Sequence, residues 1–151
     1  MLARDIMTRE VITVKPDTTI EEAAKIMVDN KISGIPVVDD EGRILGIVTE
    51  KDLMVKASEF KVPFYITLFD SIIFLENPIK FNNHIRKYFA SQVKEVMTAR
   101  VITVDENTPV PEVARIMQNE KVNRVPVVKD GVITGIITRN DILKFLVRKD
   151  G

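Results

Sequence analysis

The sequence contains neither cysteine nor tryptophan, and His84 is its single histidine. Disulfide bonds, thiolate nucleophiles and cysteine-based zinc sites are therefore excluded, and a histidine-based metal site would have too few ligands. All apolar runs are far shorter than the ~18 residues that a membrane-spanning helix requires. The first ten residues carry four charged side chains where a signal peptide would be apolar. We expect a cytoplasmic protein without a structural metal.

Neither sign of charge prevails along the chain. Lys and Arg together number 22, as do Asp and Glu, so the formal net charge is zero. Without an overall basic field, we expect neither nucleic acid nor an anionic membrane as a partner. The chain is 45% hydrophobic and has only seven prolines and six glycines, which excludes disordered and collagen-like architectures. Its 151 residues suit one domain, or two half-size units that share a core.

The chain contains an internal duplication with an offset of ninety residues. Met7-Thr8 recurs as Met97-Thr98. The other matched segments are Val11–Val14 with Val101–Val104, Ile26-Met27 with Ile116-Met117, Pro36–Val38 with Pro126–Val128 and, after one deletion, Gly46–Asp52 with Gly135–Asp141. Roughly half of the positions in the two aligned stretches are identical. This similarity identifies two copies of one structural unit.

Each copy has the residue pattern of a strand, a helix, two further strands and a final helix. Val11–Val14 is a short β-branched run that ends at a proline turn, and Ile35–Val38 is a continuous apolar run typical of a buried strand. Asp40–Gly42 predicts a turn before a returning strand at Ile44–Val48. The last helix is expected to begin near Lys51.

The first helix of each copy has both a start signal and an apolar stripe. Thr18 and Glu21 have the spacing of a capping box, and Thr108-Pro109 supplies an N-cap residue followed by an N1 proline. The stripes consist of Ile20, Ala23, Ala24 and Met27 in one copy and of Val110, Val113, Ala114 and Met117 in the other. We therefore expect the methionines to fill the core.

The predicted fold is an α+β module of two βαββα repeats that pack with pseudo-twofold symmetry. A unit of about fifty residues buries too little apolar surface to be stable alone, whereas two copies can share a core. We place the first repeat at residues 1–56, an insert at 57–93 and the second repeat at 94–151, within one integrated module. Clefts between the repeats are the expected positions for a small ligand.

The insert differs from the repeats because it is rich in aromatic residues. It holds six of the seven phenylalanines and both tyrosines, namely Phe60, Phe64, Tyr65, Phe69, Phe74, Phe81, Tyr88 and Phe89. We expect it to be largely helical, with one helix over 79–90. A solvated tether would not carry so many aromatic side chains. The favoured interpretation is a cap on the chain's own core; a subunit interface, and a surface for a membrane or another partner, are the alternatives.

Each repeat carries Gly-Ile-aliphatic-Thr-x-x-Asp where a strand leads into a helix. The structural explanation for Thr-x-x-Asp is helix capping. The functional explanation is nucleotide binding, because free N–H groups and a hydroxyl suit phosphate and a carboxylate suits the two hydroxyls of a ribose. The preceding glycine would let a ligand approach the backbone. The duplication in register favours the functional explanation.

In this ordered and duplicated pattern the chain resembles the cystathionine-β-synthase (CBS) domain family, as a tandem pair or Bateman module. The resemblance covers residues 5–55 and 95–145. It implies a regulatory module that binds AMP, ADP, ATP or S-adenosylmethionine, without catalysis and without a required cofactor. It also implies a homodimer.

The resemblance assigns a role to seven residues in the two copies. Asp52 and Asp141 would accept the ribose hydroxyls. Thr49 and Thr138 would lie near phosphate, and Ile32 and Val122 near adenine. Arg124 would reach phosphate, whereas the first copy has Gly34 at that place. We therefore expect unequal sites, the tighter one carrying Asp141 and Arg124.

Two functions from different classes follow from these observations. The first is an adenosyl-nucleotide sensor that acts on an unidentified regulated protein. The alternative is a structural or dimerisation module that docks a partner through the insert and binds no nucleotide. A catalytic function has little support, because the sequence has no P-loop motif, no evident general base and no metal cluster, and His84 is expected to be a polar residue on a helix face.

Overall fold

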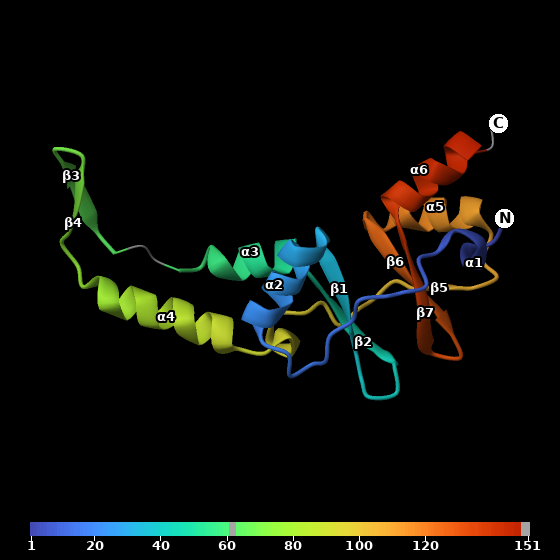
Figure 1. The fold of residues 1–151 in the computed structure, drawn as a ribbon, viewed down its shortest axis with the longest axis horizontal. Helices are drawn as coiled ribbons and strands as arrows, with labels where there is room; N and C mark the ends of the chain where they lie inside the picture. Colours follow the sequence, from blue (N-terminus) through green and yellow to red (C-terminus); the bar gives the residue numbers. More distant parts are fainter. Residues whose placement is uncertain (61–62, 149–151) are drawn as a thin grey trace.

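The computed structural model describes residues 1–60 and 63–148. In chain order the elements are α1 (Ala3–Ile6), α2 (Ile20–Asn30), β1 (Gly34–Val38), β2 (Ile44–Thr49), α3 (Glu50–Ala57), β3 (Tyr65–Leu68), β4 (Ser71–Phe74), α4 (Pro78–Ala90), a 3₁₀ turn (Val93–Glu95), β5 (Val104–Asp105), α5 (Val110–Asn119), β6 (Arg124–Lys129), β7 (Val132–Thr138) and α6 (Arg139–Arg148). Two similar α+β units lie side by side, as expected, and the insert extends away from them (Figure 1).

The central hairpin of each repeat has the same register. In the first, Gly34 pairs with Thr49 and Val37 with Gly46; in the second, Arg124 pairs with Thr138 and Val127 with Gly135. Both hairpins contain a bulge at the following position, and both turn at a glycine with a φ of 81°. All five residues of β1 are buried, which confirms the buried strand predicted at Ile35–Val38.

The first predicted strand of each repeat is much shorter than expected. Val14 makes a single parallel bridge to Val37, and β5 is two residues long. The residues before them leave their own repeat and pair with the other one: Thr8 bridges to Ile136. Because this path runs between the repeats, its β-branched residues cannot extend the sheet.

These crossing segments make each core a composite of both halves of the chain. Ala3 and Met7 are buried among residues of the second repeat. Val93 is buried among residues of the first, where its N–H donates to the Thr18 carbonyl (2.8 Å). Of the predicted apolar stripes, Ala23 and Met27 of α2 and Val113 and Met117 of α5 line the two cores. Ile20 and Val110 are also buried, whereas Ala24 and Ala114 are half-buried. The repeats are therefore interlocked by exchanged segments.

The helix start signals are displaced by one residue from their predicted positions. α2 is capped by Thr19, whose Oγ1 accepts from the Glu22 N–H (3.1 Å). Thr18 instead accepts from the Lys15 N–H, within the preceding turn. α5 likewise begins after Pro109 rather than at it. Two adjacent threonines followed by two adjacent glutamates offer two capping registers, and the turn at Lys15 selects the second.

Close packing against the crossing segments, and not ligand binding, explains why positions 46 and 135 are glycines. A Cβ atom on Gly46 would lie 2.7 Å from Met97 Sδ and 2.9 Å from the Thr98 carbonyl oxygen. The side chain of Met7 would crowd Gly135 in the same way. The expectation that a ligand approaches the backbone here is therefore wrong: the crossing segment of the other copy occupies that space.

We expect Gly46→Ala to lower the free energy of unfolding by ~1–3 kcal/mol, the usual cost of forcing atoms into a packed interior. Chemical denaturation followed by circular dichroism measures this change. Leu45→Ala, at a partly exposed neighbour on the same strand, serves as the control and should change stability less. Equal stability of Gly46→Ala and the unmodified protein would contradict the close packing of 97–98 on β2.

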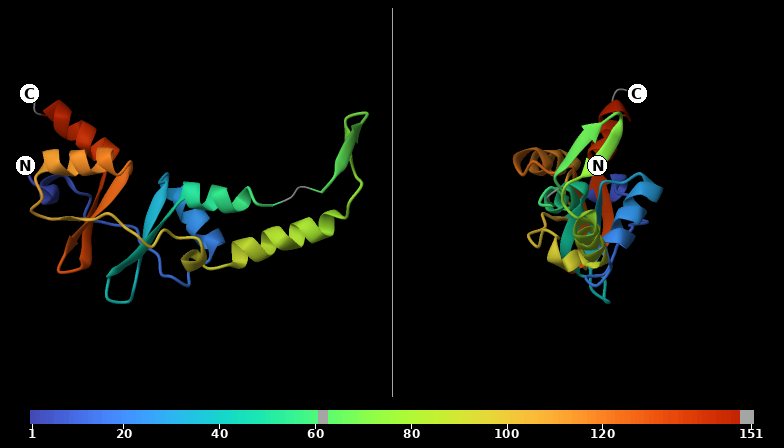
Figure 2. Two further views of the ribbon diagram at one scale, coloured as in Figure 1. Left: turned by 180° about the vertical axis from the view of Figure 1, so that it is seen from behind. Right: turned by 90° about the vertical axis from the view of Figure 1, so that its left-hand side faces the viewer.

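The insert contains a hairpin that the sequence analysis did not predict. β3 and β4 form this hairpin at the far end of the insert, and α4, predicted at 79–90, leads back to the repeats (Figure 2). The prediction of a largely helical insert was thus incomplete. Phe69 and Asp70 adopt φ values of 50° and 64° in its tight turn, where the sequence has neither glycine nor asparagine to signal it.

Candidate functional site

Both Thr-x-x-Asp motifs form complete capping boxes. The Thr49 backbone N–H donates to Asp52 Oδ2 (2.9 Å), and the Asp52 N–H donates to Thr49 Oγ1 (3.2 Å). In the second repeat the Thr138 N–H donates to Asp141 Oδ2 (2.8 Å). The capping explanation therefore holds for both motifs, and a ligand role would be an additional one.

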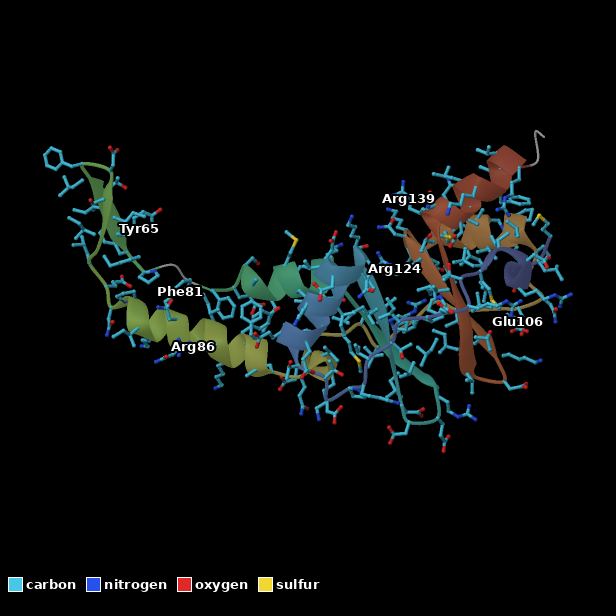
Figure 3. The ribbon with its side chains drawn as sticks, in the orientation of Figure 1. Tyr65, Phe81, Arg86, Glu106, Arg124 and Arg139 are labelled. Carbon is cyan, nitrogen blue, oxygen red and sulfur yellow. The ribbon has the colours of Figure 1, made fainter. Side chains whose placement is uncertain are left out.

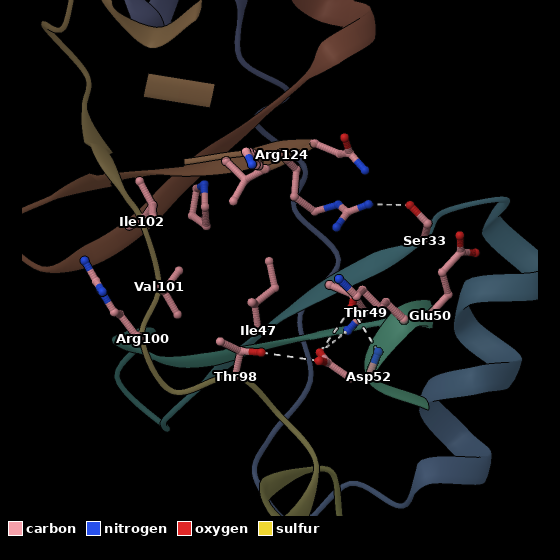
Figure 4. A pocket seen from close by; sticks show the side chains of 15 residues that line it. Ser33, Ile47, Thr49, Glu50, Asp52, Thr98, Arg100, Val101, Ile102 and Arg124 are labelled. Atoms are coloured by element: carbon pink, nitrogen blue, oxygen red, sulfur yellow. Dashed lines mark hydrogen bonds between the residues drawn. The ribbon is translucent and has the colours of Figure 1, made fainter. Parts of the chain in front are cut away.

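A cavity of about 350 Å³ lies between the two repeats at the start of α3 (Figure 4). We call it the Asp52 cavity. Its lining is Ser33, Ile47, Thr49, Glu50, Lys51, Asp52, Thr98, Arg100, Val101, Ile102, Lys121, Val122, Asn123, Arg124 and Pro126. Its volume is in the range of small-molecule sites, which lie at ~300–1,000 Å³. Both repeats and one crossing segment contribute to it.

The Asp52 carboxylate uses one oxygen for capping and presents the other toward the crossing segment. Oδ2 accepts from Thr49, whereas Oδ1 accepts from the Thr98 hydroxyl (3.3 Å). The Oδ1 contact is long and its donor is a rotatable hydroxyl, so a ligand hydroxyl can replace it. The geometry thus leaves acceptor capacity facing the cavity.

A second cavity of about 480 Å³ is related to the first by the internal duplication. We call it the Thr138 cavity. Its lining is Thr8, Glu10, Val11, Ile12, Lys31, Ile32, Ser33, Gly34, Pro36, Asn123, Arg124, Ile136, Thr138 and Arg139. Thr8, Val11 and Ile32 stand where Thr98, Val101 and Val122 stand in the Asp52 cavity. The matched linings show the pseudo-twofold relation at the level of side chains.

Arg124 lies at the centre of this arrangement and lines both cavities. Its guanidinium donates to the Ser33 hydroxyl across the boundary between the repeats (Figure 4). It lies directly over Gly34, where a Cβ atom would be 2.6 Å from Nη1. Gly34 and Arg124 occupy equivalent positions, so the absent side chain of one copy makes room for the long side chain of the other.

Arg124 remains charged although it is partly buried. Burial lowers the pKa of its guanidinium, while the Glu50 and Asp52 carboxylates oppose that shift. An arginine remains protonated at neutral pH even after a moderate decrease from its high reference value. The Asp52 cavity also contains Lys51, Arg100 and Lys121, so its four basic side chains outnumber its two acidic ones. The balance suits an anion.

The structure groups the predicted residues differently from the sequence analysis. Arg124 and Val122 share a cavity with Thr49 and Asp52 of the other repeat. Asp141 lines neither inter-repeat cavity; it borders a smaller one of about 170 Å³ beside the N-terminus. Arg124 also lines the Thr138 cavity, and Thr138 is hydrogen-bonded to Asp141, so a site that uses Asp141 with Arg124 stays a prediction beside the Asp52 cavity.

Ile32 of the first copy and Thr138 of the second copy both line the Thr138 cavity. The sequence analysis missed the residues that the crossing segments contribute: Thr98, Arg100, Val101 and Ile102 in one cavity, and Thr8, Val11 and Ile12 in the other. The duplicated Met-Thr and Val-Ile-Thr-Val runs are the available signal, but the sequence analysis assigns the second run to a strand and gives Met-Thr no ligand role.

Metal ligands, His84 and membrane-spanning helices are the other features that could indicate a function. In residues 1–60 and 63–148, no three His, Asp or Glu side chains are placed to hold a metal ion. His84 lines a cavity within the insert, together with Glu59 and Glu76. None of the helices in these two ranges has the length and apolar character needed to span a bilayer.

Comparison with curated proteins finds relatives that match along nearly the whole chain. A CBS domain-containing protein of Dictyostelium discoideum is 30% identical over 149 residues, which are 98% of this chain and 92% of that protein. Inosine-5'-monophosphate dehydrogenase of Methanocaldococcus jannaschii is 35% identical over 143 residues. This chain spans 23% of that enzyme, and 31% of the protein MJ1404 of the same organism, to which it is 36% identical.

Solved structures share the fold. The CBS domain pair of protein MJ0100, in complex with 5'-methylthioadenosine and S-adenosyl-L-methionine, matches with a TM-score of 0.74 and 29% identity over 99% of this chain and 98% of that one. CBSX2 of Arabidopsis thaliana in complex with AMP matches with a TM-score of 0.76 and 25% identity, over 99% of this chain and 98% of that one. The CBS domain model matches residues 3–59 and 93–148. The chain therefore belongs to the CBS domain family and carries two copies of the domain.

Proposed function

We propose that this CBS pair is a regulatory module that binds an adenosine 5'-phosphate between its repeats and has no catalytic activity of its own. The observation that carries the proposal is the Asp52 cavity, which combines a carboxylate, an aliphatic surface and an arginine in about 350 Å³. Relatives crystallised with AMP or with S-adenosyl-L-methionine support the ligand class.

The three chemical parts of such a ligand correspond to three parts of the cavity lining. Asp52 is the acceptor for ribose hydroxyls, with Thr98 released from its long hydrogen bond. Val101, Ile102 and Val122 provide aliphatic contacts for adenine. Arg124 is the donor for phosphate, because its planar fork matches two phosphate oxygens. In the Thr138 cavity Ile32, Thr138 and Arg124 would act in the same way, and the lining carboxylate there is Glu10 of the crossing segment.

The charge of the lining favours phosphorylated adenosine over S-adenosylmethionine. Four basic side chains surround the Asp52 cavity, and the sulfonium of S-adenosylmethionine would add a further positive charge near them. AMP, ADP and ATP bring negative charge to the same place. We therefore expect S-adenosylmethionine to bind more weakly than AMP.

Occupancy can be transmitted because the ligand would contact both repeats. A ligand shifts a conformational equilibrium only as far as its affinities for the two states differ. In the Asp52 cavity, Asp52 belongs to one repeat and Arg124 to the other, so a bound nucleotide would favour one relative tilt of the repeats. A regulated partner protein would respond to that tilt.

Thermal unfolding with AMP, ADP, ATP, adenosine and S-adenosylmethionine tests the ligand class. A ligand at 100 times its dissociation constant stabilises the folded state by ~2.7 kcal/mol, which a melting experiment detects. We expect AMP, ADP and ATP to raise the melting temperature more than adenosine or S-adenosylmethionine does at the same concentration. Flat melting temperatures throughout would instead favour the alternative, a structural module without a nucleotide ligand. Intact ATP after long incubation with magnesium is the expected control for the absence of hydrolysis.

A further inference from the structure

The insert ends in a two-stranded hairpin that is apolar on both faces. In its register Tyr65 pairs with Phe74 and Ile66 with Ile73. Because side chains alternate along a strand, the first pair lies on one face and the second on the other. A two-stranded hairpin alone is marginally stable in water, and it needs further strands or a packing partner.

Nothing in the described part of the chain covers this hairpin. Every residue of β3 and β4 is exposed, and the tip residue Phe69 is 98% exposed. Figure 3 shows Tyr65 far from the repeats, at the end of the insert. The favoured sequence-based interpretation, a cap on the chain's own core, is therefore wrong for residues 64–75. Among the described residues of the insert, those at its base pack on the first repeat.

The base of the insert is attached to the first repeat through Tyr88. Tyr88 of α4 is 7% exposed, and its hydroxyl donates to the Leu53 carbonyl of α3 (2.9 Å). Its ring packs edge-on against Phe60, with centroids 5.2 Å apart. Burial, and secondarily the charge of Glu59, raises the pKa of Tyr88, so its hydroxyl remains a donor at neutral pH. The hairpin therefore precedes a helix, α4, whose other end is packed on the first repeat.

The exposed apolar surface of the insert has the size of one side of a stable interface. It comprises Phe64, Tyr65, Ile66, Leu68, Phe69, Ile72, Ile73, Phe74, Leu75, Ile79 and Phe89. At on the order of 150 Å² for each fully exposed side chain, their exposed fractions correspond to roughly 900 Å². This total is spread over both faces of the hairpin and over α4, and it is comparable with the ~800 Å² that a standard interface buries on each partner.

The chemistry of this surface matches a second copy of itself. Residues 63–75 contain one charged side chain, Asp70, and no basic one. Interface cores are depleted of charge and enriched in Tyr and Phe, and homodimer interfaces are the more apolar class. A nucleic acid or an anionic bilayer would require basic residues on the hairpin itself, whereas the basic residues of the insert lie outside 63–75 in the sequence. A twofold pairing presents the same patch from both copies, so equal areas are buried on each side.

We propose that two copies of this chain associate through their inserts, each hairpin packing on the hairpin and α4 of the other copy. The pairing covers both apolar faces and satisfies the hairpin's need for a packing partner. This association does not require a nucleotide, so it can be tested independently of the proposed function.

Analytical ultracentrifugation of the full chain, with the variant Ile72→Lys, tests the proposal. We expect a dimer for the unmodified chain and at least a hundredfold weaker association for the variant, because each dimer would bury two unpaired ammonium groups. Ile72 is 61% exposed, so the repeats should keep their melting temperature. Met54→Lys, at an exposed apolar position on α3, is the matched control and should leave the dimer intact.

Three results would overturn the proposal. One is a monomeric unmodified chain at tens of micromolar. Another is a dimer that survives Ile72→Lys. The third is binding of the unmodified chain to neutral phosphatidylcholine vesicles that is lost in Ile72→Lys, which would identify the hairpin as a membrane-inserting element. Nucleotide-dependent melting of the same variants shows whether the ligand site is affected, so failure of one proposal is distinguishable from failure of the other.

Discussion

Asp52→Ala is expected to weaken AMP binding by roughly 10- to 150-fold, the equivalent of the ~1.5–3 kcal/mol that hydrogen bonds to a charged group contribute. The Asp52 carboxylate faces the cavity that contains Arg124 and Val122, and its Oδ1 has only the long contact to Thr98 to lose. Isothermal titration calorimetry measures the change directly.

The matched control for this experiment is Asp141→Ala. Asp141 caps α6 with the same contacts that Asp52 uses to cap α3, but it lines neither inter-repeat cavity. Loss of either cap should cost ~0.5–2 kcal/mol of stability. We expect similar destabilisation of both variants and a large loss of affinity only for Asp52→Ala. A larger loss for Asp141→Ala would restore the sequence-based assignment and reject the cavity-based one.

Arg124→Ala is expected to lower the affinity for AMP by roughly 10- to 100-fold and the affinity for adenosine by far less, since the lost partner is phosphate. The linings of the two inter-repeat cavities share one charged side chain, that of Arg124. The substitution removes bulk above Gly34 and therefore introduces no clash. Calorimetry with the two ligands separates the phosphate contribution from that of the nucleoside.

Two variants make the Arg124 experiment specific. Arg124→Lys keeps the charge but loses the planar fork, so an intermediate affinity is expected. Arg139→Ala removes a cation that lines only the Thr138 cavity, and it should leave binding in the Asp52 cavity unchanged. If adenosine and AMP lose affinity equally in Arg124→Ala, the guanidinium orders the repeats through Ser33 and does not bind phosphate.

Local sequence patterns determined the repeated unit but not the register of every element. The apolar run at Ile35–Val38 and the stripe that includes Met27 and Met117 appear in the structure as predicted, because periodicity reports directly which side chains must be buried. The capping box moved from Thr18 to Thr19 because both registers satisfy the same local rule. The β3–β4 hairpin escaped prediction because its tight turn has no glycine or asparagine and places Phe69, a residue type that rarely adopts a positive φ, beside Asp70.

The sequence by itself determined the duplication, the α+β repeat and the residue types available for a ligand: carboxylates after threonines, aliphatic side chains and one arginine. Tertiary structure alone decided which of these meet. Exchange of the crossing segments places Thr98 and Val101 beside Asp52, and the pseudo-twofold packing places Arg124 over Gly34. The physical reason is that a site between two copies depends on how their surfaces pack, and packing across an interface has no signature in local spacing.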